Sequence, residues 1–344
     1  MKHFLTALTL SLTLCAAAAA QSAGSSVSPR MQEIAQQELE SGLRDYRAGS
    51  GCMLVLDAST GDILAQAVSG STMTANTYFE PGGLFIPVTV AAAMEYTRLT
   101  PETLIDINTL VTEEGDTIES LYPHRALPTW CVIAKSLDAA AARIALSVGN
   151  GKLNIFLHQV GFDKAKTFAH ASAQAGCGRK IRVTPLQIAG FYAALANGGR
   201  KVIPDTMPGA VAGERIMAVQ HCTDIISAME AAVTGQRAFN GIYEPGTAGR
   251  AAVPGARVAC STGTTPINNT TDGADTAREC IASAIGIVPA DKPAMAVLVV
   301  LENPRPPFIT PGGDTVAAPI LSKTLQRMLP EIGITPQTDT QSRK

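Results

Sequence analysis

The stretch from Thr184 to Gly199 constrains the fold most strongly. It begins Thr-Pro-Leu-Gln, ends Asn-Gly-Gly, and is largely apolar between. Thr184 can cap a helix through its hydroxyl, and Pro185 suits the first helical position because its missing N–H would be unpaired there anyway. Asn197 and the two glycines after it favour the turn that ends a helix. The pattern therefore predicts a short apolar helix whose two ends are both set by the sequence.

A helix followed by a hairpin is expected earlier in the chain. Apolar residues recur at helical spacing over 30–46, with charged and amide side chains between them. Segments 51–56 and 63–68 have the composition of strands, and Gly61 in the turn between them can take a positive φ. Further strands are predicted over 282–289 and 294–301, and further helices over 129–149, 216–233 and 316–329.

The first twenty residues have the pattern of a secretory signal peptide. A short basic start precedes an apolar run over 4–15 and five alanines over 16–20, which suit cleavage after Ala20. The predicted organisation is a signal peptide over 1–20, a flexible leader over 21–29, one folded domain over 30–331 and a polar tail over 332–344.

Two alternatives exist for the N-terminal segment. The apolar run could stay uncleaved as an anchor, or Cys15 could carry a lipid, although Leu14 is larger than the residue that lipoprotein signals have there. No later stretch approaches the ~20 apolar residues that span a bilayer. The protein is therefore expected to be exported to the periplasm or the cell exterior, with no membrane span after signal cleavage.

Charge and cysteine content exclude several classes of function. The 344 residues carry a formal net charge of −2 and no basic cluster, so binding to nucleic acid is not expected. Six cysteines follow the signal segment, but no Cys or His spacing matches a metal site, and no cofactor is predicted. In an exported protein these cysteines could form up to three disulfides, or some could remain buried thiols.

The segment Glu80-Pro-Gly-Gly-Leu-Phe-Ile-Pro87 leads, after Val88 and Thr89, into an apolar helix predicted over 90–94. It resembles the nucleophile turn of the penicillin-binding protein transpeptidase family, which reads Glu-Pro-Gly-Ser-x-x-Lys-Pro. In that turn the Ser and Lys are three residues apart on one helix face, so that the amine can activate the hydroxyl. Gly83 and Ile86 stand at these two positions here. Neither residue has the oxygen or the amine that the reaction needs.

Two further motifs of the family stand later in the chain, each with a change. Its Ser-x-Asn motif appears as Ser136-Leu-Asp138, and its Lys-Thr-Gly-Thr strand motif appears as Ser261-Thr-Gly-Thr264. In the family the Ser relays a proton to the leaving amine, and the strand Lys holds the substrate carboxylate. Asp138 cannot donate a hydrogen bond when ionised, and Ser261 has no positive charge. Capping of a helix is the alternative explanation for Ser136 and Asp138.

The resemblance covers about 30–329 and implies the fold of serine transpeptidases and β-lactamases. That fold is α+β: an antiparallel sheet of five strands is flanked by helices, and an all-helical lobe lies between the nucleophile turn and the strand motif. The hairpin over 51–65 and the capped helix over 184–199 resemble the first two strands and a signature helix of the family.

Three side chains needed for acyl transfer are absent, although the glycines, prolines and helix ends around them remain. Because losing one member of a catalytic unit already removes most of its rate, the sequence predicts a noncatalytic homologue. It would act in the cell wall as a scaffold or regulator of cell-wall synthesis proteins, or as a noncovalent binder of peptidoglycan stem peptides. The alternative is an active D,D-transpeptidase, carboxypeptidase or other acyl hydrolase whose substitute nucleophile is Ser136, Ser261 or Cys260.

Groups for binding a ligand remain at the family's positions. The backbone N–H groups of Gly83 and Thr264 stand at its oxyanion-hole positions, and the hydroxyls of Thr262 and Thr264 stand at its carboxylate-binding positions. The predicted ligand-binding residues are Gly83, Ser136, Asp138, Thr262, Gly263 and Thr264.

One disulfide candidate follows from the expected strand order. If the strands over 258–264 and 281–288 pair as antiparallel neighbours, Cys260 and Cys280 fall near each other. The loop over 266–278 would then overhang the site.

Overall fold

The computed structural model describes residues 25–112, 115–120, 122, 126–162, 172–207, 213–237, 241–267 and 279–336. The predicted signal peptide, residues 21–24 of the leader, most of the loop over 266–278 and the end of the polar tail lie outside these residues. Among the helices that the structure describes, none is both long enough and apolar enough to cross a membrane.

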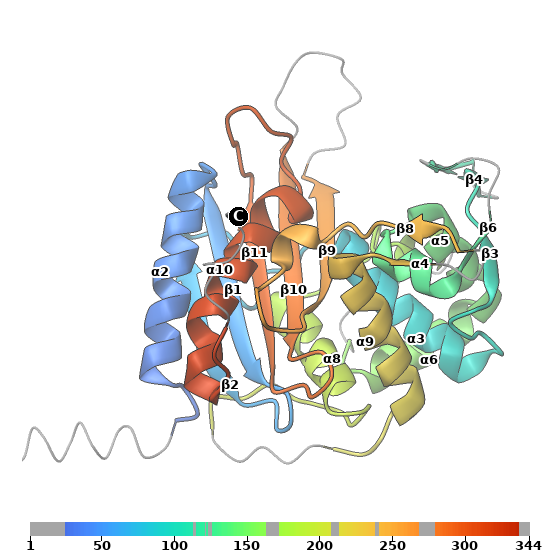
Figure 1. Cartoon of the computed structure of the whole chain (residues 1–344). Helices are drawn as coiled ribbons and strands as arrows, with labels where there is room; N and C mark the ends of the chain where they lie inside the picture. The colour runs from blue at the N-terminus through green and yellow to red at the C-terminus, as the bar shows by residue number, and fades with distance from the viewer. Residues whose placement is uncertain are drawn as a thin grey trace, which may run out of the picture.

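A five-stranded antiparallel sheet forms the centre of the fold, as predicted (Figure 1). Its order is β2–β1–β11–β10–β9, so the first hairpin pairs with strands from the end of the chain. The strands are nearly continuous apolar runs because helices cover both faces of the sheet. Their bounds are β1 (Ser50–Asp57), β2 (Ile63–Ser69), β9 (Ala259–Pro266), β10 (Cys280–Val288) and β11 (Met295–Glu302).

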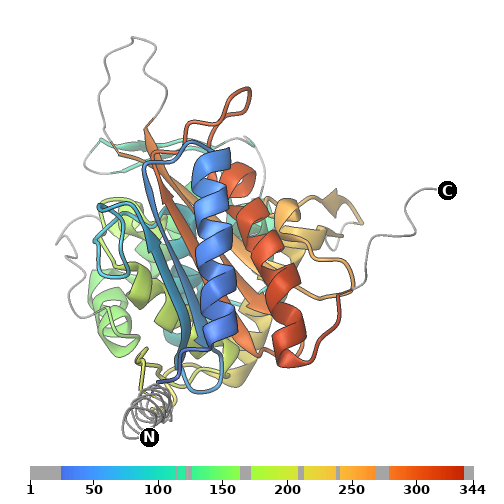
Figure 2. The same cartoon turned by 90° about the vertical axis from the view of Figure 1, so that its left-hand side faces the viewer.

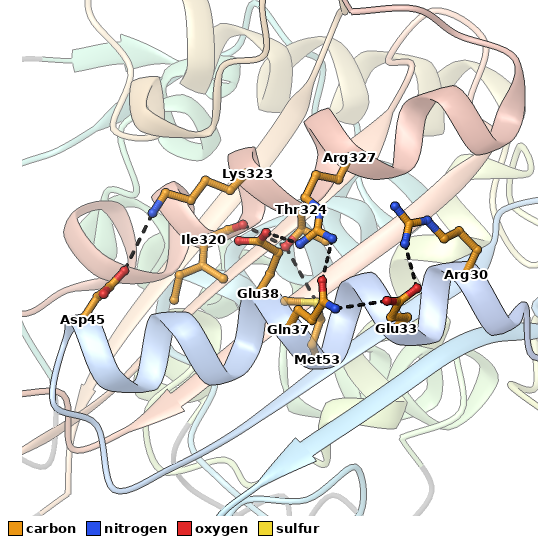
Figure 3. A network of polar contacts seen from close by, with 10 residues as sticks. All are labelled: Arg30, Glu33, Gln37, Glu38, Asp45, Met53, Ile320, Lys323, Thr324 and Arg327. Carbon is orange, nitrogen blue, oxygen red and sulfur yellow. Dashed lines mark hydrogen bonds and ion pairs between the residues drawn. The ribbon is translucent and has the colours of Figure 1, made fainter.

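Helices α2 (Pro29–Asp45) and α10 (Ala318–Met328) lie side by side on one face of the sheet (Figure 2). Gly42 allows them to approach closely, because a Cβ there would collide with the Ile320 side chain. Arg327 joins the helices through its Nη1, which lies 2.6 Å from Glu38 Oε1 (Figure 3). The expected first and last helices therefore form one layer.

Helix α8 (Pro185–Ala196) packs against the sheet strands β1, β10 and β11 and confirms the predicted capped helix. The Thr184 hydroxyl accepts the Gln187 N–H, and the Gln187 side chain accepts the Thr184 N–H in return. The helix ends at Asn197, after which Gly198 and Gly199 both have positive φ. The sequence pattern alone therefore specified both ends of this helix.

The lobe between the nucleophile turn and the strand motif is mainly helical but also contains short strands. Within the described residues, its helices are α3 (Ile86–Tyr96), α4 (Thr129–Ala134), α5 (Asp138–Val148), α6 (Asn150–Gln159), α7 (Ser172–Gly176) and α9 (Val219–Thr234). Two-stranded sheets join β3 (Leu104–Asp106) to β6 (Ala126–Pro128), β4 (Leu110–Val111) to β5 (Thr117–Ile118), and β7 (Gln236–Arg237) to β8 (Tyr243–Glu244).

Short turns complete the described elements. They are η1 (Gly82–Phe85), η2 (Gly249–Ala251), η4 (Leu329–Ile332) and the π-helical turn η3 (Gly313–Ala317), which precedes α10. The helix predicted over 129–149 is in fact two helices, α4 and α5. The break falls at Ser136, whose φ of 51° lies in the left-handed region that interrupts a right-handed helix.

The register of β9 and β10 contradicts the predicted Cys260–Cys280 disulfide. The strands pair as expected, but Cys260 lies opposite Gly286 and Cys280 lies opposite Pro266. The two cysteines are therefore six positions apart along the sheet, roughly 20 Å at the usual rise per residue, well beyond the reach of a disulfide. The six cysteines of the described residues are all buried, and none is joined to another by a disulfide.

Candidate functional site

The turn at Gly82 and Gly83 is held tightly by the helical lobe. Gly82 has a φ of 52°, which favours glycine, and its N–H donates to the Gly178 carbonyl oxygen at 3.0 Å. Two residues further on, the Leu84 carbonyl accepts the Tyr192 hydroxyl at 2.8 Å. These contacts fix the turn at the junction of the sheet and the lobe.

Ser136 occupies the space that a side chain at position 83 would need. A Cβ built on Gly83 would collide with the Ser136 hydroxyl oxygen and with the Thr262 carbonyl oxygen. The left-handed backbone of Ser136 is strained for a residue with a Cβ, at a cost of about 1–3 kcal/mol, and such strain gathers at functional sites. The structure thus brings a serine hydroxyl to the centre of a turn that lacks its own.

The other two altered motif positions contribute no charge to this turn. Ile86 is 1% exposed and belongs to the apolar core. The Ser261 hydroxyl donates to the Gly83 carbonyl oxygen at 3.4 Å and lies close to the Tyr192 hydroxyl, which itself donates to Leu84. Burial raises the pKa of Tyr192 well above its usual value, so the Tyr192 hydroxyl stays neutral.

The strand motif on β9 lies directly against the turn. A Cβ on Gly263 would collide with the Pro81 carbonyl oxygen, and a Cβ on Gly82 would lie 3.4 Å from the Thr264 nitrogen. Thr262 is buried, whereas Thr264 is exposed and its hydroxyl accepts the Gly313 N–H at 2.9 Å. The structure therefore brings together the predicted backbone donors of the turn and of Thr264.

Asp138 also lies at this site, where it forms an ion pair with Arg179. The Arg179 Nη2 atom lies 2.6 Å from Asp138 Oδ2, and the Asp138 side chain is 26% exposed. Burial raises the pKa of Asp138, and the Arg179 charge opposes that rise. Neither predicted residue caps α5 through its side chain, because Leu137 is the N-cap. Asp138 is nevertheless the first residue of α5, where a negative charge suits the helix start, so the alternative of a helix-start residue holds for Asp138 and not for Ser136.

Arg179 is a site residue that the sequence did not reveal. It follows Gly178, whose carbonyl holds the turn, and it precedes the capped helix α8 by a few residues. The one local signal is a basic residue after the Gly-x-Gly of 176–178, which is too common a pattern to indicate a site.

Lys135 and Cys260 do not serve the site directly. The Lys135 amine is buried in an ion pair with Glu244, at 3.1 Å, and lies 4.8 Å from the centroid of the Tyr122 ring. Cys260 is fully buried, and burial raises the pKa of its thiol, so a reactive thiolate is disfavoured. Of the candidate nucleophiles, Ser136 is therefore the one placed at the turn and half-buried rather than enclosed.

Comparison with known proteins identifies the same family as the motifs. Residues 51–326 match the family described as "Penicillin binding protein transpeptidase domain". Peptidoglycan D,D-transpeptidase FtsI of Escherichia coli strain K12 is 24% identical over 358 residues, covering 94% of this chain and 58% of that relative. The FtsI of Buchnera aphidicola subsp. Schizaphis graminum is 25% identical over 346 residues, covering 90% and 58%. The chain thus spans less than two thirds of the length of these relatives.

Solved structures share the fold. The transpeptidase domain of penicillin-binding protein 3 from Burkholderia pseudomallei superposes with a TM-score of 0.77, at 24% identity, over 92% of this chain and 98% of that one. A peptidoglycan glycosyltransferase from Burkholderia ambifaria gives a TM-score of 0.75, at 25% identity, over 92% of this chain and 99% of that one.

These relatives contradict the prediction of a noncatalytic homologue. Both sequence relatives are named as peptidoglycan D,D-transpeptidases, which points to an enzyme. The prediction was wrong, and it rested on the missing side chains at Gly83, Ile86 and Ser261. The match over residues 51–326, with the shared fold, shows that this chain belongs to the penicillin-binding protein transpeptidase family.

Proposed function

We propose that this protein is a peptidoglycan acyl-transfer enzyme of the D,D-transpeptidase or carboxypeptidase type, with Ser136 as its nucleophile. It would be exported and act on stem peptides of the cell wall. The observation that carries the proposal is the position of the Ser136 hydroxyl, which fills the space of the missing side chain at Gly83. The names of the FtsI relatives support the reaction class.

The proposed reaction has two steps. The Ser136 oxygen attacks the carbonyl carbon of a peptide bond in the stem peptide, the C–N bond breaks, and the amine leaves with a proton, so that an ester remains on Ser136. An amine of a second stem peptide, or water, then attacks the ester carbonyl and releases the serine hydroxyl. The backbone N–H groups of Gly83 and Thr264 would stabilise the oxyanion in both steps.

Asp138 is the proposed carrier of the proton. It stands two residues after Ser136, and burial raises the pKa of its carboxyl, which makes the carboxylate a stronger base. Arg179 holds the carboxylate through its Nη2 atom at 2.6 Å. In this scheme Asp138 takes the proton from the attacking hydroxyl and passes it to the leaving amine. Lys135 is not available for this role, because Glu244 holds its amine.

The test is acylation by a reactive penicillin, followed by intact mass and by mapping of the modified peptide. The expected result is one acyl group on the peptide that contains Ser136, lost in Ser136→Ala and retained in the control Ser261→Ala. A label on any other residue would contradict the role of Ser136. An unlabelled protein, beside Escherichia coli FtsI labelled in the same experiment, would contradict the proposed reaction.

A further inference from the structure

The strand motif of this site lacks the cation that would hold a negatively charged substrate group. Ser261 offers a neutral hydroxyl, which already donates to Gly83. The Thr264 hydroxyl accepts the Gly313 N–H, and toward a carboxylate it can offer a single neutral O–H donor. A substrate carboxylate bound on β9 alone would therefore lose its water without meeting a positive charge.

Arg179 carries a positive charge and directly follows a residue of the helical lobe that contacts the same turn. The residue before it, Gly178, accepts the Gly82 N–H at 3.0 Å, and a Cβ on Gly178 would collide with the Gly82 backbone. The Arg179 N–H donates to the Gln174 carbonyl at 2.9 Å, which fixes the backbone of this residue. The side chain is 49% exposed, so its guanidinium is accessible to a ligand.

The guanidinium has donors to spare beyond its contact with Asp138. Arginine has five N–H donors in a planar fork, and the hydrogen bond to Asp138 comes from Nη2 alone. A second carboxylate can therefore bind to the same group in the bidentate geometry that arginine favours. Asp138 at the same time holds the fork in one orientation.

We infer that Arg179 binds the C-terminal carboxylate of the peptide substrate and replaces, from the helical lobe, the cation that is absent at Ser261. This inference rests on the proposed function, because it assigns a part of the substrate to the same site. The chemical class is a peptide with a free α-carboxylate. The peptide carbonyl under attack would lie between this carboxylate and Ser136.

The test measures noncovalent binding in the Ser136→Ala background, where no ester can form. The two probes are an N-acetylated peptide ending in D-Ala-D-Ala and the same peptide with an amidated C-terminus. The Ser136→Ala protein with Arg179 intact is expected to bind the free acid about tenfold or more tightly than the amide, as for a charge-assisted hydrogen bond. Arg179→Gln should remove this preference without changing the affinity for the amide, and Arg179→Lys should restore part of it.

Lys180→Gln is the matched control. Lys180 is the next residue, is also 49% exposed, and also pairs with a carboxylate, Asp116 at 2.7 Å. Its removal should leave the preference for the free acid intact. If Lys180→Gln lost the preference for the free acid as fully as Arg179→Gln does, the cause would be a general charge effect, and the inference would be overturned.

The double variant Arg179→Gln with Asp138→Asn separates two roles of the arginine. If Arg179 binds the substrate, the preference stays lost when both charges are removed. If Arg179 merely neutralises Asp138, the preference returns, and the inference fails. Absence of binding to either probe would also overturn it.

The two proposals can fail separately. Acylation of Ser136 with an unchanged preference in Arg179→Gln would retain the proposed function and reject the inference. A preference for the free acid that depends on Arg179, in a protein that no penicillin acylates, would retain the inference on Arg179 and reject the proposed function.

Discussion

The Lys135 amine lies 3.1 Å from the Glu244 carboxylate, and each of the two side chains is only 3% exposed. This ion pair joins the end of α4 to β8, and the Thr247 N–H next to it donates to the Ala134 carbonyl at 3.1 Å. Ser136 follows Lys135 directly. The pair therefore fixes the backbone that carries the proposed nucleophile.

Lys135→Met is expected to lower the free energy of unfolding by about 3–5 kcal/mol, because the buried charge of Glu244 would lose the cation that balances it. Lys135→Met with Glu244→Leu should recover much of this loss, since no charge then stays buried. Urea denaturation measures the free energy of unfolding of the single and the double variant. Lys180→Met, which breaks an exposed pair, serves as the control and should cost under about 1 kcal/mol. A similarly small cost for Lys135→Met would show that the pair is not enclosed in solution.

Thr184→Ala is expected to destabilise the protein by about 1 kcal/mol, because it removes the hydroxyl that accepts the Gln187 N–H at the start of α8. Ser28→Ala at the start of α2 is the comparison, and its effect should be smaller because the corresponding hydrogen bond is long, at 3.4 Å. Thermal or urea unfolding checks the order of the two variants. The opposite order would contradict the importance of the capping box.

Much of the fold could be predicted because its signals are local. The ends of α8 follow from the chemistry of Thr184 and of the glycines after Asn197, and the first hairpin follows from two apolar runs around Gly61. The register between β9 and β10 could not be predicted in this way. It depends on packing along the sheet, and a strand composition that fixes the partner does not fix which residues face each other.

The site could be predicted only in part for the same reason. Its motif positions are local, so Gly83, Ser136 and Ser261 were identified. The left-handed backbone of Ser136 and the approach of Arg179 depend on contacts between segments far apart in the chain. No local pattern encodes those contacts, so the replacement of one hydroxyl by another became visible only in three dimensions.

The thiols of the native protein are expected to react very slowly. Burial raises the pKa of Cys52, Cys177 and Cys222 to about 12, and it also raises the pKa of Cys260 and Cys280. At about pH 8 only about one in ten thousand of the first three thiols would be ionised, and thiolate is the reactive form. Alkylation followed by intact mass should show almost no label before unfolding and full label afterwards. Rapid labelling of the folded protein would contradict the burial of the thiols. Cysteines that resist labelling after unfolding without reductant would show that disulfides had formed.

Acylation should depend on pH through Asp138. Burial raises the pKa of this carboxyl above its usual value, so the proposed base loses its proton at a higher pH than an ordinary aspartate does. The rate of acylation by a penicillin is therefore expected to rise with pH, by about tenfold per unit below that pKa, and then to level off. Asp138→Asn should remove this rise and lower the plateau. Arg179→Gln should shift the rise to higher pH, because the Arg179 charge now opposes the effect of burial. An unshifted profile in Arg179→Gln would exclude Asp138 as the titrating group.

The contact between Ser136 and position 83 can be measured as a coupling energy. Gly83→Ala is expected to cost about 1–3 kcal/mol, because its Cβ would meet the Ser136 hydroxyl and the Thr262 carbonyl. Ser136→Gly removes the hydroxyl and relieves the left-handed backbone, so alone it should stabilise the protein by up to about 1 kcal/mol. In the double variant, Gly83→Ala should cost at least about 0.5 kcal/mol less than in the parent, since one of its two collisions is gone.

The control for this cycle is Gly151→Ala in α6, where a Cβ would meet nothing within 4 Å. It should be neutral or slightly stabilising, and its effect should be the same with Ser136 and with Gly at position 136. Urea denaturation of the parent and the five variants gives both couplings. If Gly83→Ala and Ser136→Gly were additive, the Ser136 hydroxyl would not occupy the space at position 83 in solution. The proposed nucleophile would then lose the geometry on which it depends, whatever the stability of the single variants.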